Sequence, residues 1–344
     1  MCNIAGYVGK MSAAPILIKM IRIQQGINAG FYTGLAVHDG KTLDYRKTIG
    51  DLDTLLDTTD ADKLCGNTGI IHSRTPDGGD SRWSHPFVTL RDKRVKLAYV
   101  ANGSPGSFAK YNHRRNAIAD SLIADGYDIP CKIDTKENFY NRLSSGEAVH
   151  MSDVMCQLIY KYKCAGESTD KAMASAFQYM PSEIVGLAVD EEHSDRIYFS
   201  RINQPMFLGF DDNGAYLASS PIAFPESVKE YQLLPTCSSG VVYADHVEIK
   251  SFEDSEISVC EIDEKALKVA EETIIEFTKG KSSPAGEIFD RIEEKLACGK
   301  PVQADASFYI TLARLMREGR LSLSEGRVTV KGLDAPKTFF TWVD

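Results

Sequence analysis

The chain has 344 residues, of which 43% are hydrophobic and 25% are charged. These values are ordinary for a folded protein and exclude disorder, a collagen-like repeat and a coiled-coil rod. The formal net charge of -9, from 48 acidic and 39 basic residues, argues against binding of bulk nucleic acid or an anionic membrane. The length predicts about two domains.

The eight cysteines contain no CxxC pair, and no Cys/His spacing is typical of a zinc site, so neither a metal nor a cofactor is expected. The sequence also lacks the glycine-rich motifs of dinucleotide and P-loop binding. No apolar run is long enough for a membrane span, and the N-terminus does not resemble a signal peptide. The cytoplasm is therefore the expected location.

The first part of the chain alternates between predicted strands and one helix. Ile16, Leu17, Met20 and Ile21 recur at helical spacing and predict a helix over 15–25. Short apolar runs predict strands at 3–9, 34–37, 69–72 and 97–101. The last two strands run directly into polar loops that contain glycine.

The middle of the chain is predicted to be mostly helical from 108 to 162 and β-rich from 184 to 250. Ser152-Asp153 is expected to cap the N-terminus of a helix. The predicted strands are 184–189, 196–199, 206–209 and 215–218, followed by a closing hairpin of 240–243 and 247–249.

The acidic, serine-bearing segment 251–262 is predicted to be a linker. Helices are expected near 263–279, 285–298 and 303–319, followed by a hairpin that turns about Glu325-Gly326. We therefore expect a large domain over 1–250 and a small tail over 263–344. This order of elements is not the regular β-α alternation of a doubly wound fold.

Cys2 is the cysteine with a potential chemical role. Methionine before a small residue is commonly removed, which would leave Cys2 with a free α-amine beside its thiol. An α-amine titrates near pH 8, and it can accept the proton of a thiol whose pKa is about 8.5. Such a pair activates a nucleophile without a histidine. The alternative is an ordinary buried cysteine at the end of a strand.

The opening Cys2-Asn3-Ile4-Ala5-Gly6-Tyr7-Val8-Gly9 resembles that of class II glutamine amidotransferases, which are N-terminal-nucleophile hydrolases. Further segments resemble the family in the same order. They are 34–37, His72-Ser73-Arg74 with Gly78-Gly79, Ala101-Asn102-Gly103, Ser152-Asp153, and the strands near 207 and 216. The resemblance spans roughly 2–250 and implies an α+β fold, the four-layer αββα sandwich.

The resemblance also implies a role for each matched residue. Cys2 would be the nucleophile, and Asn102 and Gly103 would bind the oxyanion. Arg74 would clamp the α-carboxylate of glutamine in the loop that contains Gly78, and Asp153 would receive the α-ammonium. Simpler interpretations are a hairpin turn at Asn102-Gly103, a surface arginine and a helix cap. His72 and His85 are expected to be structural.

Two features depart from the family. Thr75 stands where members with a sugar-phosphate synthase usually carry an aromatic residue, which puts ammonia gating in doubt. Residues 251–344 are too few for the fused synthase domain, so a separate acceptor protein is expected as partner. The tail resembles a winged-helix module. Because the charge of the tail is nearly balanced, docking to a protein is as plausible as DNA binding. A homo-oligomer is also possible.

The sequence thus predicts a glutamine-hydrolysing amidotransferase that releases ammonia for an acceptor on a separate partner. One alternative is a glutamine-sensing or docking module with little turnover, acting through its tail. Another is an N-terminal-nucleophile amide hydrolase with a different substrate.

Overall fold

The computed structural model describes residues 2–76, 78–103, 109–111, 113–135, 141–181, 183–253 and 255–343. The expected removal of Met1 therefore falls outside the described residues, as do residues 108, 112 and 136–140 of the predicted helical region. No helix within the described ranges is both long enough and apolar enough to cross a membrane.

Seven antiparallel strands form the first sheet, in the order β13-β11-β12-β1-β4-β2-β3. β1 lies at its centre, and its side chains are buried from Asn3 to Val8 because both faces of the sheet are covered. The strands are β1 (Asn3–Gly9), β2 (Tyr32–His38), β3 (Leu43–Ile49), β4 (Thr68–Arg74), β11 (Phe207–Asp211), β12 (Gly214–Ala218) and β13 (Tyr231–Leu233).

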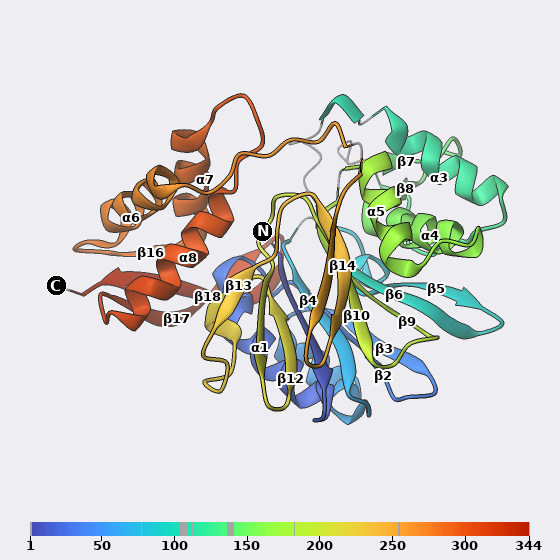
Figure 1. Cartoon of the computed structure of the whole chain (residues 1–344), viewed down its shortest axis with the longest axis horizontal. Coiled ribbons are helices and arrows are strands. Elements are labelled where there is room, and N and C mark those ends of the chain that lie inside the picture. The colour runs from blue at the N-terminus through green and yellow to red at the C-terminus, as the bar shows by residue number, and fades with distance from the viewer. Residues whose placement is uncertain are drawn as a thin grey trace.

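Six antiparallel strands form the second sheet, in the order β15-β14-β10-β9-β6-β5. Side chains such as Ile4 and Ile70 from the first sheet pack against Val100 and Leu187 from the second, so the two sheets lie face to face (Figure 1). The strands are β5 (Phe87–Arg91), β6 (Arg94–Gly103), β9 (Glu183–Asp190), β10 (Arg196–Arg201), β14 (Ser238–Tyr243) and β15 (Val247–Ser251).

Helices cover the outer face of each sheet and complete the four-layer αββα sandwich that the resemblance implied. α1 (Ala13–Asn28) places Leu17, Met20 and Ile21 at helical spacing against the first sheet, beside α2 (Leu52–Thr58). The second sheet is covered by α3 (Arg114–Ala124), α4 (Met151–Cys164) and α5 (Thr169–Tyr179). The short hairpin β7 (Asn141–Arg142) and β8 (Ala148–Val149) precedes α4. The described residues also form single 3₁₀ turns, which are η1 (Ala61–Lys63), η2 (Ser81–Trp83), η3 (Ala109–Tyr111) and η4 (Pro221–Ala223).

The cap of α4 differs from the prediction. The helix begins at Met151, and its N-cap is His150, whose ring Nδ1 accepts a hydrogen bond from Ser152 N at 3.2 Å. Ser152 and Asp153 therefore lie in the first turn. Any side chain with a free acceptor can satisfy an unpaired helical N–H, and here the half-buried imidazole does so.

The C-terminal part of the chain contains three helices and a three-stranded sheet in the order β16-β18-β17, drawn orange to red in Figure 1. The element order is helix, strand, two helices and two strands, as expected for a winged-helix-like arrangement. The elements are α6 (Glu264–Thr278), β16 (Ser282–Pro284), α7 (Ala285–Leu296), α8 (Ala304–Arg317), β17 (Leu321–Val330) and β18 (Leu333–Trp342).

The predicted turn at Glu325-Gly326 is wrong. β17 continues through both residues, which pair with Thr338 and Lys337 of β18. The chain reverses instead at Lys331-Gly332, where both residues have positive φ, 52° and 79°. Two consecutive positive φ values are what a tight two-residue hairpin turn requires.

This C-terminal part packs closely against the sandwich. Ile27 of α1 and Phe207 of β11 share a hydrophobic cluster with Ile274 of α6 and Phe308 of α8. Arg327 of β17 forms an ion pair with the buried Asp51, 2.9 Å apart, next to the first sheet. These contacts fix the position of α7 and α8 over one end of the two sheets.

Candidate active site

Cys2 lies where β1 begins, level with the end of β4. Its side chain is half-buried, and the backbone N–H of Thr75 donates a hydrogen bond to Sγ at 3.4 Å. The Thr75 hydroxyl lies 3.5 Å from the same sulfur. An N–H directed at sulfur favours the thiolate over the thiol. The thiolate is the form that attacks a carbonyl carbon.

Asn102 and Gly103 come from the end of β6 in the opposite sheet. Asn102 Nδ2 donates a hydrogen bond to the carbonyl oxygen of Cys2 at 3.1 Å, so the structure brings the predicted nucleophile and oxyanion donor together. The pairing of β6 with β9 shifts register between Asn102 and Gly103. A bulge of this kind re-aims side chains at the end of a strand and is common beside active sites.

Arg74 ends β4 and is held rigidly. Its guanidinium donates to the carbonyl oxygens of Gly78 (3.0 Å) and Trp83 (3.4 Å) and lies over the ring of Tyr32, 4.6 Å from its centroid. Gly78 has a φ of +100°, a conformation that side chains rarely adopt. Gly78 thus contacts Arg74 through its backbone and is not among the described residues that line the cavity at Cys2.

Asp153 occupies a different environment from the other predicted residues. Its carboxylate is buried, and both oxygens are in use: Oδ2 accepts from Cys131 N and Oδ1 from Gln157 Nε2, each at 3.1 Å. Burial raises the pKa of Asp153. Asp153 does not appear among the described residues that line the cavity, whereas its neighbour Ser152 does.

The cavity at Cys2 has a volume of about 640 Å³, within the usual range for small-molecule sites. Cys2, Arg74, Asn102 and Gly103 all line it. The C-terminal part contributes a further section of its wall, consisting of Gly286, Phe289, Asp290 and Glu293 from α7 and Asp305 from α8. The cavity therefore combines residues from the two ends of the chain.

Three histidines lie at this cavity: His85 and the half-buried His150 line it, and the buried His72 stacks on His85. The rings of His72 and His85 stack with their centroids 3.8 Å apart, and His72 Nε2 donates to the Ala101 carbonyl at 3.0 Å. Burial lowers the pKa of His72 to about 3, and burial also holds the pKa values of His85 and His150 well below the usual range. All three rings are therefore neutral near pH 7, which suits the predicted structural role of His72 and His85.

Sequence reasoning did not identify Glu183, Arg115 or Asn141, which also line the cavity. Glu183 accepts a hydrogen bond from Ser152 Oγ at 2.7 Å, and burial raises its pKa to about 7. The available signal was a lone carboxylate directly before the apolar run 184–189. A charged residue at the start of a buried strand must find a partner or a ligand.

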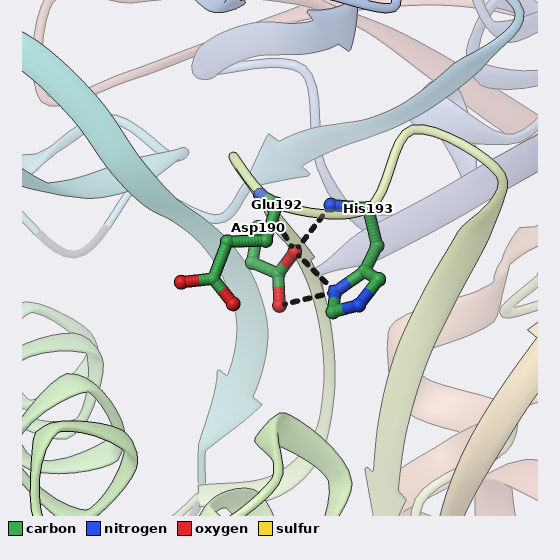
Figure 2. A group of neighbouring side chains, drawn as sticks. All are labelled: Asp190, Glu192 and His193. Atoms are coloured by element: carbon green, nitrogen blue, oxygen red, sulfur yellow. Dashed lines mark hydrogen bonds and ion pairs between the residues drawn. The ribbon is translucent and has the colours of Figure 1, made fainter.

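One group of side chains resembles a metal site: Asp190, Glu192 and His193, at the turn between β9 and β10. In Figure 2 the His193 ring forms a hydrogen bond with the Asp190 carboxylate. That carboxylate also accepts from Lys163 Nζ at 2.9 Å and from Thr169 Oγ1 at 2.7 Å. The lysine ammonium already supplies the cation, so the described residues form an ion-pair network here.

The chain is similar to known proteins in sequence and in structure, although no protein-family model matches it. It is 28% identical over 284 residues to a glutamine–fructose-6-phosphate aminotransferase (isomerizing) of Bacteroides thetaiotaomicron, which covers 81% of this chain and 38% of that protein. It is 24% identical over 341 residues to the protein of the same name from Chlorobaculum tepidum, covering 97% and 47%. The chain thus spans less than half the length of these relatives.

A solved structure with the same fold is the glutamine phosphoribosylpyrophosphate amidotransferase of B. subtilis, complexed with ADP and GMP. The TM-score is 0.58 at 15% identity, covering 88% of this chain and 65% of that one. The chain therefore has the fold of the class II, N-terminal-nucleophile glutamine amidotransferases. Its relatives in sequence are named as glutamine–fructose-6-phosphate aminotransferases, in agreement with the family resemblance.

Proposed function

We propose that the protein hydrolyses glutamine to glutamate and ammonia, with Cys2 as the nucleophile after removal of Met1. The observation that carries this proposal is the position of the Cys2 sulfur at the cavity wall, where it accepts a hydrogen bond from the Thr75 N–H. The carbonyl oxygen of the same residue accepts a hydrogen bond from Asn102 Nδ2. The curated relatives, whose names contain glutamine, support the choice of substrate.

In the proposed reaction the α-amine of Cys2 takes the thiol proton, and the thiolate attacks the side-chain amide carbon of glutamine. Asn102 Nδ2 and Gly103 N–H hold the resulting oxyanion. The C–N bond then breaks, and ammonia leaves with the proton returned by the ammonium group. Water hydrolyses the thioester, which releases glutamate and restores the thiol.

We also propose that residues 1–250 form the catalytic unit and that residues 263–344, joined by the linker 251–262, cover its site. α8 corresponds in order to the helix that enters DNA in winged-helix proteins, yet nine of its side chains are buried. This burial favours a covering role over DNA binding. We propose that ammonia then passes to an acceptor carried by a separate protein.

The proposal is tested by following glutamate release from glutamine by the full chain. Wild-type protein is expected to turn over, and Cys2→Ala to lose the activity, while Cys65→Ala at an exposed cysteine keeps it. Intact mass shows whether Met1 is absent. Normal turnover by Cys2→Ala, or a retained Met1 in active protein, contradicts the mechanism. Binding of glutamine by the wild type without turnover would favour the sensing module instead.

A further inference from the structure

Glu183 is the buried carboxylate closest in register to the predicted oxyanion donors. It is the first residue of β9 and pairs directly with Gly103 at the bulge of β6. Its side chain lines the cavity although the residue is only 1% exposed. A carboxylate at this position can reach only the cavity contents and its immediate protein neighbours.

One of the two carboxylate oxygens of Glu183 is unused. Oε1 accepts the hydrogen bond from Ser152 Oγ, whereas Oε2 has no hydrogen-bond partner among the described residues. The positive charge of Arg115 on α3 acts on the carboxylate, and the phenol of Tyr99 on β6 lies within its electrostatic range. A buried oxygen left without a hydrogen bond is costly, so Oε2 fits a ligand that brings a donor.

Asp153 is unsuited to the role that the family resemblance implied for it. Both of its oxygens already accept hydrogen bonds from the protein, and they hold the backbone at Cys131 and the side chain of Gln157. An incoming ammonium would have to displace one of these buried partners. Ser152, one residue earlier, instead fixes the carboxylate of Glu183.

We propose that Glu183 Oε2 receives the α-ammonium of the amino-acid substrate, opposite the guanidinium of Arg74 at its α-carboxylate. This inference rests on the proposed glutamine hydrolysis and assigns its substrate class, a free α-amino acid amide. In glutamine the α-carbon is three bonds from the reacting carbonyl carbon, so the head group and the oxyanion donors must lie close together. The pairing of Glu183 with Gly103 meets this requirement.

The test compares glutamine with glutaramate, the same amide without the α-ammonium. Glu183→Gln keeps the shape of the side chain and its bond to Ser152 but loses the charge. We expect its KM for glutamine to rise roughly 10- to 100-fold, the usual effect of losing one charged hydrogen bond, with kcat/KM for glutaramate unchanged. Glu248→Gln, at an exposed glutamate of β15, is the matched control and should change neither.

Binding by the Cys2→Ala protein separates this inference from the proposed hydrolysis, because calorimetry needs no turnover. Adding Glu183→Gln to this variant should weaken the binding of glutamine but not the binding of glutaramate. Equal weakening of both ligands, or no effect on glutamine, overturns the role of Glu183. If the Glu183→Gln protein fails to fold, Ser152→Ala serves as the test variant. It should weaken the binding of glutamine, but not that of glutaramate, by a smaller factor. A wild type that binds glutamine selectively without hydrolysing it would refute the hydrolysis alone.

Discussion

Asn102 Nδ2 and the carbonyl oxygen of Cys2 are joined by a hydrogen bond of 3.1 Å that crosses from the second sheet to the first. The bond connects the ends of β6 and β1 at the cavity wall. The separation of the proposed nucleophile from its oxyanion donor is therefore set by the packing of the two sheets, and a rigid scaffold of this kind preorganises a site.

Replacing Asn102 tests this geometry. Asn102→Ala removes one oxyanion donor, and we expect kcat for glutamine hydrolysis to fall by about 10²–10³ with a smaller change in KM. Asn67→Ala, which removes a long hydrogen bond at the surface, is the control. Steady-state kinetics measure both variants, and a kcat within a few-fold of wild type for Asn102→Ala would show that another group binds the oxyanion.

The pKa of Glu183 predicts how substrate binding depends on pH. Burial raises this pKa to about 7, so the carboxylate becomes protonated as the pH falls through 7 and loses its attraction for an ammonium. KM for glutamine should therefore rise below pH 7, and in Glu183→Gln it should stay level. Among the described residues, Arg115 and Tyr99 act electrostatically on Glu183. The other titratable or charged groups that line the cavity are Cys2, Arg74, His85, His150, Asp290, Glu293 and Asp305. An unchanged pH profile in the variant would assign the titration to one of these.

The same raised pKa has a consequence for stability. The folded protein holds the Glu183 proton up to about pH 7, whereas the unfolded chain releases it near the ordinary glutamate pKa of 4.5. The contribution of this group is thus fully present below pH 4.5 and is lost as the pH rises to 7, by about 3 kcal/mol. Glu183→Gln should gain stability relative to wild type over this interval. Urea unfolding at several pH values measures the difference, and a constant difference would refute the raised pKa.

Gly6 lies where the first sheet closely approaches side chains of the second sheet. A Cβ at this position would lie 3.0 Å from Leu187 Cδ1 and 3.1 Å from Ile197 Cδ1, both in the opposite sheet. We expect Gly6→Ala to lower the free energy of unfolding by about 1–3 kcal/mol, the usual cost of overpacking a core. Gly286→Ala provides a contrast in denaturant unfolding, because its Cβ would meet its nearest atom only at 3.7 Å. Equal stability of Gly6→Ala and wild type would mean that the sheets can move apart freely.

Cys260 and Cys298 are expected to form a disulfide on oxidation. Their sulfurs lie 2.6 Å apart, and the hydrogen bond from Cys260 lowers the pKa of the Cys298 thiol. Oxidised dithiothreitol should remove two hydrogen atoms from the protein mass and raise its stability by about 2–4 kcal/mol. Cys298→Ser should abolish both effects, and Cys164→Ser at another exposed cysteine should not. Oxidation through a different pair would refute this prediction.

Local patterns predicted most of the elements correctly, because strands such as β1 and helices such as α1 carry their apolar periodicity in contiguous residues. The turn at Lys331-Gly332 was missed because Glu325-Gly326 offers an equally plausible turn sequence, and only pairing with β18 decides between them. The sequence showed no reason to prefer the imidazole of His150 as a helix cap over Ser152.

The candidate site also contains some residues that the sequence predicted and others that it did not. Cys2, Arg74, Asn102 and Gly103 stand in motifs, and the structure brings them to one cavity. Glu183 belongs to no motif, and its importance depends on which oxygens remain unpaired after folding. The contribution of Phe289 to the cavity wall could not be predicted either. It depends on α7 packing near Cys2, although the two are far apart in the sequence.

This long-range wall has a consequence for synthesis of the protein. Cys2 is translated before either sheet, whereas Phe289, Asp290 and Asp305 follow only after both sheets have been translated. Until α7 and α8 have docked, the cavity of a nascent chain lacks these walls. The pocket is therefore completed only after α7 and α8 have been synthesised and have docked.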